Sequence, residues 1–363
     1  MTAAAGKIGK SLVRQGMGAA VLCSAMTITV PAFAQTAAAP AMLEVPARSV
    51  PVPSDVSPQM AKIIGAPLRT NWNVLPKTGE EWKPVAEAGA VPTIKNVPGM
   101  LERLKVKIEP TVIDGVRAYI VTPETIAPEN RNRQLIHMHG GCYVLNPREA
   151  GLPEAIFMAG FGHIKVISVD YRMPPEAVFP AALDDGITVW KAALKTTAAK
   201  NMAIFGTSAG GALTLEMVLK AKDLGLPLPA AIAPGTPMSD VTKVGDTFQT
   251  NAMVDNVLVS PDGFCDAGAK VYANGHDMKD PLLSPVYGDM NGFPPTILTS
   301  GTRDLLLSNT VRVHRKLRQA GVEAVLQVYE GMSHAHYVRD DTAPESKEAF
   351  EEIAGFFDKH LGK

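Results

Sequence analysis

The chain has 363 residues, of which 46% are hydrophobic and 20% are charged, a composition typical of a globular protein with a large core. Its 35 basic and 36 acidic side chains give a formal net charge of -1, so charge provides no reason to expect nucleic acid or an anionic membrane as a partner. We find no internal repeat, heptad array or long low-complexity tract.

The first 34 residues have the pattern of a cleavable signal peptide. A basic start precedes an uncharged, mostly apolar stretch over residues 17–30, which is too short to cross a bilayer. The basic residues are Lys7, Lys10 and Arg14. The small residues of Ala32-Phe33-Ala34 predict cleavage after Ala34, with an uncleaved membrane anchor as the alternative. We therefore expect a periplasmic or secreted protein with no stable membrane insertion after cleavage.

The chain after residue 34 divides into three predicted parts. Residues 35–57 are rich in Ala, Pro and Val and are predicted to be a flexible linker. Residues 58–100 form the next part, in which 60–82 mix a short helical pattern with Trp72, Trp82 and prolines and show no strand pattern. We expect this stretch to pack over the main domain, which we place at residues 101–363.

The main domain combines two kinds of pattern. Alternating stretches at 105–108 and 116–121 flank Gly115 and predict a β-hairpin. Short apolar runs then alternate with helical patterns, which is typical of a mostly parallel sheet covered by helices on both faces. The runs are 135–138, 166–169, 203–205, 230–233, 296–299 and 325–328, and the helical patterns are 153–160, 182–194, 211–224, 309–320 and 344–361. In such folds the functional site lies at the carboxyl ends of the strands.

A candidate nucleophile lies between one of these strands and the next helix. The sequence Gly206-Thr207-Ser208-Ala209-Gly210 follows the run 203–205 directly. A serine on so sharp a turn brings neighbouring backbone close, and the flanking Gly206 and Gly210 leave room for it. The pattern is weak alone, but its place between a strand and a helix favours a nucleophilic Ser208 over a structural turn.

A serine nucleophile needs a general base, and His334 is the best candidate for this role. It lies in the loop after the last predicted strand, at the same edge of the sheet as Ser208. His336 shares this loop and is the nearest rival.

The acid that orients the base is predicted to be Asp304. It follows the strand at 296–299 and also lies at the carboxyl edge, although it could instead cap the helix that begins near Leu305. Asp280 and Asp289 precede that strand and would have to reach across. The order Ser208, Asp304, His334 along the chain is the order expected of an α/β-hydrolase.

Backbone N–H groups for an oxyanion hole are predicted in His139-Gly140-Gly141-Cys142, which follows the strand at 135–138. Glycines let these groups point into a site, and one such donor can contribute about 3 kcal/mol of transition-state stabilisation. The N–H of Ala209 would supply a further donor.

Cys142 and Cys265 are the two cysteines that remain after signal cleavage. They could pair in an exported protein, but the sequence does not fix connectivity. Because Cys142 lies inside the predicted oxyanion loop, where a cross-link would be awkward, we favour two free thiols.

Together these motifs resemble the hormone-sensitive lipase family of carboxylesterases, and most closely its bacterial short-chain esterase and ε-lactone hydrolase branch. The similarity covers roughly residues 104–361. Its motifs are His139-Gly140-Gly141, Asp170-Tyr171-Arg172, Pro175-Glu176, Phe179-Pro180-Ala181-Ala182, Gly206-Thr207-Ser208-Ala209-Gly210-Gly211, Asp280-Pro281 with Ser284-Pro285, Asp304-Leu305-Leu306 and Gly331-Met332-Ser333-His334.

The resemblance implies an α/β-hydrolase with an eight-stranded, mostly parallel sheet and a helical cap, built from residues 58–100 and an insertion at about 238–276. It also implies a role for each site residue. Ser208, Asp304 and His334 would form the triad, Gly140, Gly141, Cys142 and Ala209 the oxyanion hole, and His139, Gly206, Gly210 and Glu176 would support them.

Cys142 departs from the family pattern, which usually has a third glycine here. Its N–H can still donate, but a residue with a Cβ disfavours positive φ, and its thiol could crowd the acyl pocket.

We therefore expect a serine hydrolase that cleaves carboxylic esters or lactones through an acyl-enzyme, without metal or organic cofactor. The first alternative is a non-catalytic binding protein, which usually lacks a triad member. The second is a serine peptidase or amidase of related fold, which would need a large extra domain for peptide access. The partner of the predicted hydrolase would be a small ester or lactone. Whether the protein forms a homodimer is left open by the sequence.

Overall fold

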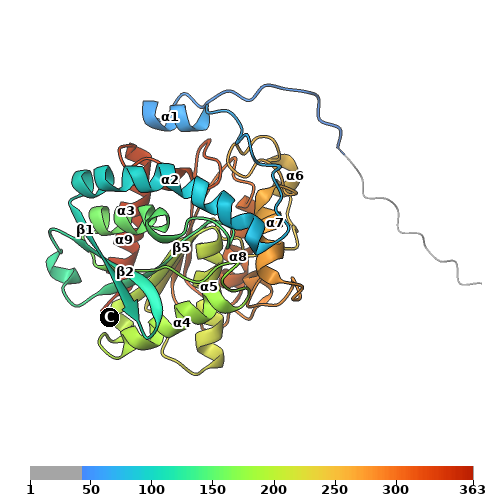
Figure 1. Cartoon of the computed structure of the whole chain (residues 1–363). Coiled ribbons are helices and arrows are strands. Elements are labelled where there is room, and N and C mark those ends of the chain that lie inside the picture. The colour runs from blue at the N-terminus through green and yellow to red at the C-terminus, as the bar shows by residue number, and fades with distance from the viewer. Residues whose placement is uncertain (1–42, 363) are drawn as a thin grey trace, which may run out of the picture. The chain divides into compact units, whose positions relative to one another are not determined.

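The computed structural model describes residues 43–362, which belong to two compact units, Met1–Arg48 and Ser49–Lys363. The predicted signal peptide at 1–34 and residues 35–42 of the predicted linker lie outside the described residues. Residues 43–48 form no helix or strand and are exposed. Every described helix and strand belongs to the second unit (Figure 1).

An eight-stranded sheet forms the centre of this unit, in the order β1-β2-β4-β3-β5-β6-β7-β8. The strands are β1 (Val106–Ile113), β2 (Val116–Pro123), β3 (Gln134–Met138), β4 (Val166–Val169), β5 (Met202–Thr207), β6 (Ala231–Gly235), β7 (Thr296–Gly301) and β8 (Ala324–Tyr329). β2 pairs antiparallel with β1 and β4, and all other pairs are parallel. The predicted hairpin and parallel core are confirmed. β4, β5, β6 and β7 are buried on both faces of the sheet, whereas the edge strand β8 is partly exposed.

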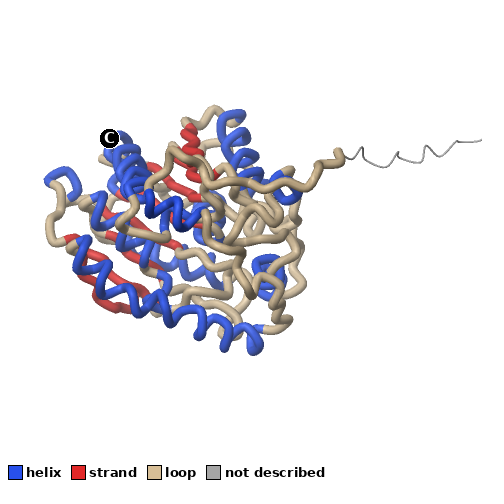
Figure 2. Tube along the Cα trace, turned by 90° about the horizontal axis from the view of Figure 1, so that it is seen from above, coloured by secondary structure: helices blue, strands red, loops and turns tan. Residues whose placement is uncertain are grey.

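Helices cover both faces of the sheet, so the predicted α/β-hydrolase fold is confirmed. One apolar core contains α4 (Ala181–Leu194), α5 (Ala209–Asp223) and α8 (Leu307–Gln319), and the other contains α3 (Pro153–Gly162) and α9 (Pro344–His360). Figure 2 shows these helices in blue around the strands in red. None of the helices in the described part of the chain combines the length and apolar character needed to cross a bilayer.

The N-terminal segment forms two helices, α1 (Pro58–Ile64) and the long α2 (Gly79–Leu104). α2 contains three prolines, Pro84, Pro92 and Pro98, although each proline inside a helix costs about 3 kcal/mol. Tertiary packing offsets this cost, because α2 buries a stripe that runs from Trp82 to Met100 against α3, the helix at Phe264–Ala273 and the 3-10 turn at Arg148–Gly151. The segment at 238–276 contains the short α6 (Thr247–Thr250) and α7 (Phe264–Ala273).

Shorter 3-10 turns complete the connections at Pro128–Asn130, Ala199–Asn201, Pro285–Tyr287 and His336–Val338. The last of them directly follows the loop that holds His334, so this loop is anchored at both ends, by β8 and by the turn.

Candidate active site

Ser208 occupies the sharp turn between β5 and α5. Its backbone has φ 65° and ψ −121°, which costs a residue with a Cβ on the order of 1–3 kcal/mol. A Cβ on Gly206 or Gly210 would lie far inside 3.0 Å of the Met138 carbonyl oxygen, so both positions need glycine. The Ser208 N–H donates to the Gly235 carbonyl over 2.9 Å. The close approach of β3 and β6 therefore holds the turn in place.

His334 and Asp304 form a buried hydrogen-bonded pair. Nδ1 of His334 lies 3.1 Å from Oδ1 of Asp304, whose Oδ2 accepts from the Thr236 hydroxyl at 2.5 Å and the Ser300 hydroxyl at 3.1 Å. Burial alone would raise the pKa of Asp304, but His334 and the donated hydrogen bonds hold that pKa below its ordinary value. An ionised carboxylate fixes the proton of His334 on Nδ1 and leaves Nε2 able to accept one.

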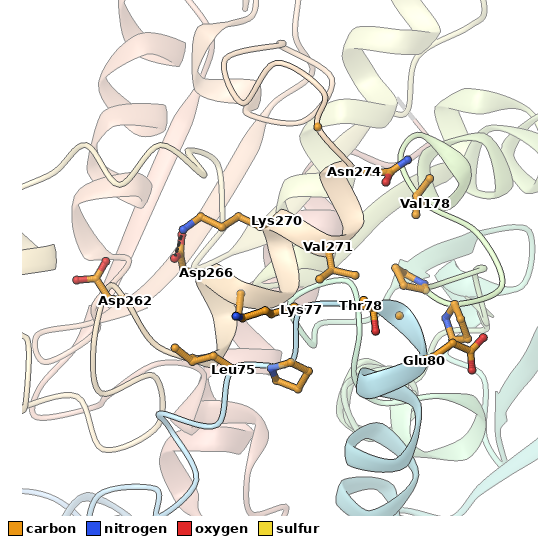
Figure 3. A pocket seen from close by; sticks show the side chains of 16 residues that line it. Leu75, Lys77, Thr78, Glu80, Val178, Asp262, Asp266, Lys270, Val271 and Asn274 are labelled. Atoms are coloured by element: carbon orange, nitrogen blue, oxygen red, sulfur yellow. Dashed lines mark hydrogen bonds and ion pairs between the residues drawn. The ribbon is translucent and has the colours of Figure 1, made fainter.

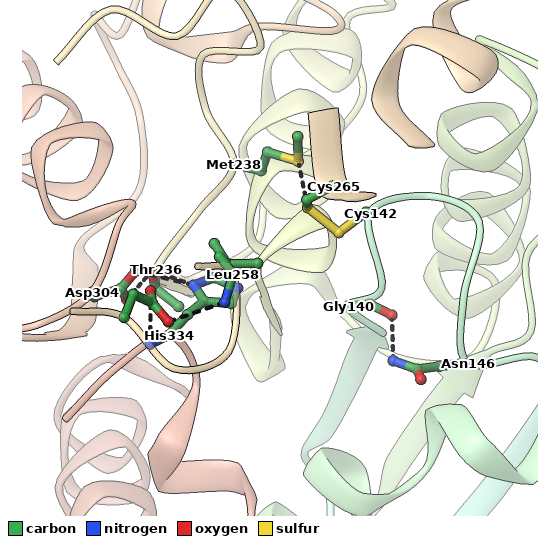
Figure 4. Close-up of a disulfide and its surroundings, with 10 residues drawn as sticks. Gly140, Cys142, Asn146, Thr236, Met238, Leu258, Cys265, Asp304 and His334 are labelled. Carbon is green, nitrogen blue, oxygen red and sulfur yellow. Dashed lines mark hydrogen bonds and ion pairs between the residues drawn. A yellow bond between two sulfur atoms is a disulfide. The ribbon is translucent and has the colours of Figure 1, made fainter. Parts of the chain in front are cut away.

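Ser208 and His334 line one cavity of about 560 Å³, together with Gly140, Gly141 and Cys142. Asp304 is fully buried and bonds to the His334 ring, as Figure 4 shows. Residues of α2 and the first residue of α7 also line this cavity, so both segments at 58–100 and 238–276 contribute to its walls. The residues that lie there are Ala86, Gly89, Pro92, Thr93, Asn96 and Met100 from α2, and Asn256, Val257, Leu258 and Phe264 from the insertion.

The glycine loop after β3 presents backbone N–H groups to this cavity. Gly141 has φ 126°, and a Cβ there would lie 2.5 Å from the Leu145 carbonyl oxygen. Asn146 donates to the Gly140 carbonyl over 3.0 Å, which fixes the loop from outside. Within residues 43–362 the N–H groups of Gly140, Gly141 and Ala209 have no hydrogen-bond acceptor. They are therefore available to a negatively charged oxygen next to Ser208.

The prediction of two free thiols is wrong, because Cys142 and Cys265 form a disulfide (Figure 4). The two cysteines are 123 residues apart in sequence, but the fold places the first turn of α7 next to the glycine loop, with a Cα–Cα distance of 5.2 Å. Cys142 does adopt a positive φ of 54° despite its Cβ. Its sulfur is bonded to the cap and is not a free thiol in the pocket. The disulfide therefore tethers the glycine loop to the cap.

His139 and Glu176, predicted to support the site, make different contacts around it. The His139 ring stacks on Tyr171 at 4.1 Å, and its Nδ1 lies 2.8 Å from the Gly140 carbonyl. Burial lowers the pKa of His139 to about 4, so this ring is neutral and supports the loop. Glu176 is half-exposed and pairs with Arg117 at 3.0 Å, which ties its loop to β2.

His336, the rival base, has both ring nitrogens engaged. Its Nδ1 accepts from the Ser333 N–H at 3.2 Å, and its Nε2 lies 2.9 Å from the Asn256 side-chain oxygen. Burial lowers the pKa of His336 to about 3. These contacts favour His334 as the base, because both nitrogens of His336 are already engaged, one within its own loop and one with Asn256 of the cap.

Three buried polar residues of the site have no place in the sequence prediction. Thr236 follows β6 at the carboxyl edge, where the strand-end rule could have found it. Asp255 accepts backbone N–H groups of Leu305 at 2.8 Å and His334 at 3.3 Å, and burial together with the charge of Asp304 raises its pKa to about 6. Glu154 accepts from the Thr207 hydroxyl at 2.6 Å, below the serine turn. No local pattern marks Asp255 or Glu154.

A larger cavity of about 770 Å³ lies between the start of α2, the loop with Pro174 and Pro175, and α7 (Figure 3). None of the predicted site residues lines it, so volume alone does not identify the site. Among residues 43–362 no group of three or more His, Cys, Asp or Glu side chains is arranged to hold a metal ion.

Comparisons with known proteins agree with this geometry. Residues 135–338 match the family model described as the alpha/beta hydrolase fold. An esterase of Acinetobacter venetianus is 30% identical over 253 residues, which cover 69% of this chain and 82% of that protein. An acetyl-hydrolase of Streptomyces hygroscopicus is 28% identical over 238 residues, covering 65% and 79%.

Solved structures give the same result. The crystal structure of esterase E25 has a TM-score of 0.85 and 44% identity, and covers 88% of this chain and 99% of that one. An esterase described as a member of the bacterial hormone-sensitive lipase family has a TM-score of 0.67 and 26% identity, covering 75% and 99%. The chain therefore belongs to the α/β-hydrolase fold family and, within it, to the bacterial hormone-sensitive lipase family.

Proposed function

We propose that this protein hydrolyses carboxylic esters through an acyl-enzyme on Ser208. The observation that carries the proposal is the Asp304–His334 pair, whose ring lines the same cavity as a serine on a strained turn. The similarity to proteins named esterase and acetyl-hydrolase supports this reaction class.

In the proposed reaction Ser208 Oγ attacks the ester carbonyl carbon while its proton moves to Nε2 of His334. Asp304 keeps the other ring proton on Nδ1 and stabilises the imidazolium that forms. The carbonyl oxygen becomes an oxyanion, which the N–H groups of Gly140, Gly141 and Ala209 would bind, with Cys142 as a further donor.

The C–O bond to the alcohol then breaks, and the alcohol leaves with the proton from His334. A water molecule attacks the acyl-enzyme with His334 as base, which releases the acid and restores Ser208. A lactone would follow the same steps, except that its alcohol and acid stay in one product molecule. Lactone hydrolysis is therefore part of the proposal.

We also propose export to the periplasm or medium. The signal-peptide pattern at 1–34 supports it, and so does the disulfide, since disulfides persist mainly in oxidising compartments. Protein recovered from the periplasm of a Gram-negative host should begin at Gln35.

The function is tested with Ser208→Ala and a panel of p-nitrophenyl esters, lactones and aminoacyl amides. The variant should remain folded and lose on the order of 10⁴-fold or more in kcat. A fluorophosphonate should label the wild type at Ser208 alone, as read by mass spectrometry of peptides. Labelling of another serine together with an active Ser208→Ala variant would exclude this mechanism, and turnover of amides alone would favour a peptidase.

A further inference from the structure

Two arginines line the candidate cavity and have no role in the proposed reaction. Arg69 lies between α1 and α2, and Arg339 directly follows the 3-10 turn after His334. The Arg69 guanidinium carbon lies 3.9 Å from the centre of the Phe264 ring, and its Nε donates to the Asn71 side chain over 2.7 Å. These contacts hold Arg69 against the wall of the cavity.

Both arginines lie on the wall that carries His334. The backbone N–H of Arg69 donates to the Asn256 carbonyl over 3.1 Å, and the Asn256 side chain in turn contacts His336. Arg339 belongs to the same loop as His334. One hydrogen-bonded group therefore joins the cap arginine to the loop that holds the proposed base.

The positive charges of this pair are not neutralised by a carboxylate. Within residues 43–362 neither Arg69 nor Arg339 forms an ion pair. Burial lowers the pKa of Arg69, and the charge of Arg339 lowers that pKa further, so the two guanidinium groups repel each other. Arg69 is half-buried and Arg339 is exposed, so water compensates part of this repulsion and a bound anion would relieve the rest.

The nearby acids are engaged elsewhere. Asp341 pairs with Arg103, and Asp340 accepts the Thr342 N–H at 2.9 Å. Desolvation lowers the pKa of Arg339, and the charge of Asp255 only partly opposes this shift. The oxygens of Asp255 accept backbone N–H groups instead. Among the described residues that line the cavity Glu154 is the one acid, and it is bonded to Thr207 and His137.

We infer that the ester cleaved by this protein carries a carboxylate, which Arg69 and Arg339 bind. The inference rests on the proposed function and narrows its substrate class. His334 gives its proton to the leaving alcohol in the proposed reaction, so the wall beside His334 faces the alcohol part of the ester. The carboxylate therefore belongs to the alcohol part, and each guanidinium offers a planar pair of donors to it.

The test compares ω-acetoxyhexanoate with ω-acetoxyhexanamide, which share the ester bond and the chain but differ in charge. The wild type should prefer the acid at least tenfold in kcat/KM, and mainly through KM, because a remote anchor binds substrate and transition state equally. The double variant Arg69→Gln, Arg339→Gln should reduce this preference at least tenfold. Any effect of the substitutions on steps common to both substrates cancels in the ratio.

Three controls sharpen the result. Arg318→Gln removes the same charge from the far end of α8, at the opposite edge of the sheet, and should leave the ratio unchanged. Arg339→Gln alone changes an exposed side chain without a hydrogen-bond partner in the described residues, so it tests the idea if the double variant does not fold. In the wild type, added salt should raise KM for the acid and leave KM for the amide unchanged.

Equal turnover of the acid and the amide by the wild type, or a preference that survives in both arginine variants, would overturn the inference alone. A preference seen only with the acyl-side pair, monomethyl adipate and its amide, would overturn the placement on the alcohol side. Failure to hydrolyse these esters while p-nitrophenyl esters are cleaved would overturn the inference alone, and failure on both would overturn the proposed function, and this inference with it.

Discussion

The two sides of Ser208 are held in place in different ways. On one side, Asp304 and His334 are fixed by hydrogen bonds from Thr236 and Ser300, which belong to the ends of neighbouring strands. On the other side, the glycine loop is tied by the Cys142–Cys265 disulfide to a helix of the cap. The acid–base side therefore depends on the sheet, whereas the oxyanion side depends on the cap.

This difference has a practical meaning. Loss of one hydrogen bond on the acid–base side should change chemistry and leave the fold intact, because the sheet still places the residues. Opening the disulfide should weaken the fold and loosen the glycine loop together, because one bond serves both.

The largest effect is expected for Asp304→Asn. The amide no longer fixes the tautomer of His334 or stabilises its charged form, so kcat should fall by about 10³–10⁴-fold with little change in KM. Hydrolysis of p-nitrophenyl butyrate and circular dichroism measure activity and fold. Ser300→Ala removes one donor to the same carboxylate and should cost less than about tenfold. A similar small loss for Asp304→Asn would point to another acid.

A smaller effect on chemistry but a clear effect on stability is expected for Cys265→Ser. Opening a loop of this size should lower the free energy of unfolding by about 2–5 kcal/mol. The freed glycine loop should lower kcat by about tenfold, or roughly 1.4 kcal/mol. Urea unfolding and ester hydrolysis report both changes.

Cys142→Ser opens the same bond from its other end, so it should match Cys265→Ser if the link itself matters. Dithiothreitol should bring the wild type to the same values and should not affect either variant. An unchanged urea midpoint in both variants would show that the cap does not hold the loop.

The smallest effect is expected from Asp255, the second buried carboxylate on the acid–base side. Its folded pKa of about 6 lies above the ordinary value of 3.8, so its contribution to stability is full below pH 3.8 and is lost as the pH rises through 6. Asp304 has a lowered pKa and acts in the opposite sense, below pH 3.8. His139 and His336, whose pKa values are lowered, also change stability in this range, but they do so equally in the wild type and in an Asp255 variant. The difference between the two proteins from pH 4 to 7 therefore reports Asp255.

The measurement compares urea unfolding of the wild type and Asp255→Asn at pH 4.5 and pH 7. The Asp255→Asn variant is less stable than the wild type at both pH values, because the amide has fewer acceptor sites for the four N–H groups. The amide does not titrate, however. The wild type should lose about 2 kcal/mol more than the variant between the two pH values. Equal losses would mean that Asp255 stays ionised throughout.

The sequence by itself determined the sheet and the residues at its carboxyl edge. Ser208 directly follows its strand, Asp304 and His334 lie in the short loops after theirs, and glycines mark the turn at Ser208 and the loop at Gly140. Such features are local, since burial on both faces requires a continuous apolar run and a crowded turn requires a residue without a Cβ.

Tertiary structure alone decided the contacts between distant segments. α2 continues through three prolines because its buried stripe packs on the domain, and Cys142 meets Cys265 because α7 lies over the glycine loop. Asp255 and Arg69 belong to cap segments that carry no motif. Even so, Asp255 accepts the backbone N–H of His334, and Arg69 lines the same cavity as Arg339. Local pattern cannot encode these pairs, because the distance between two side chains far apart in sequence is set by how whole elements pack.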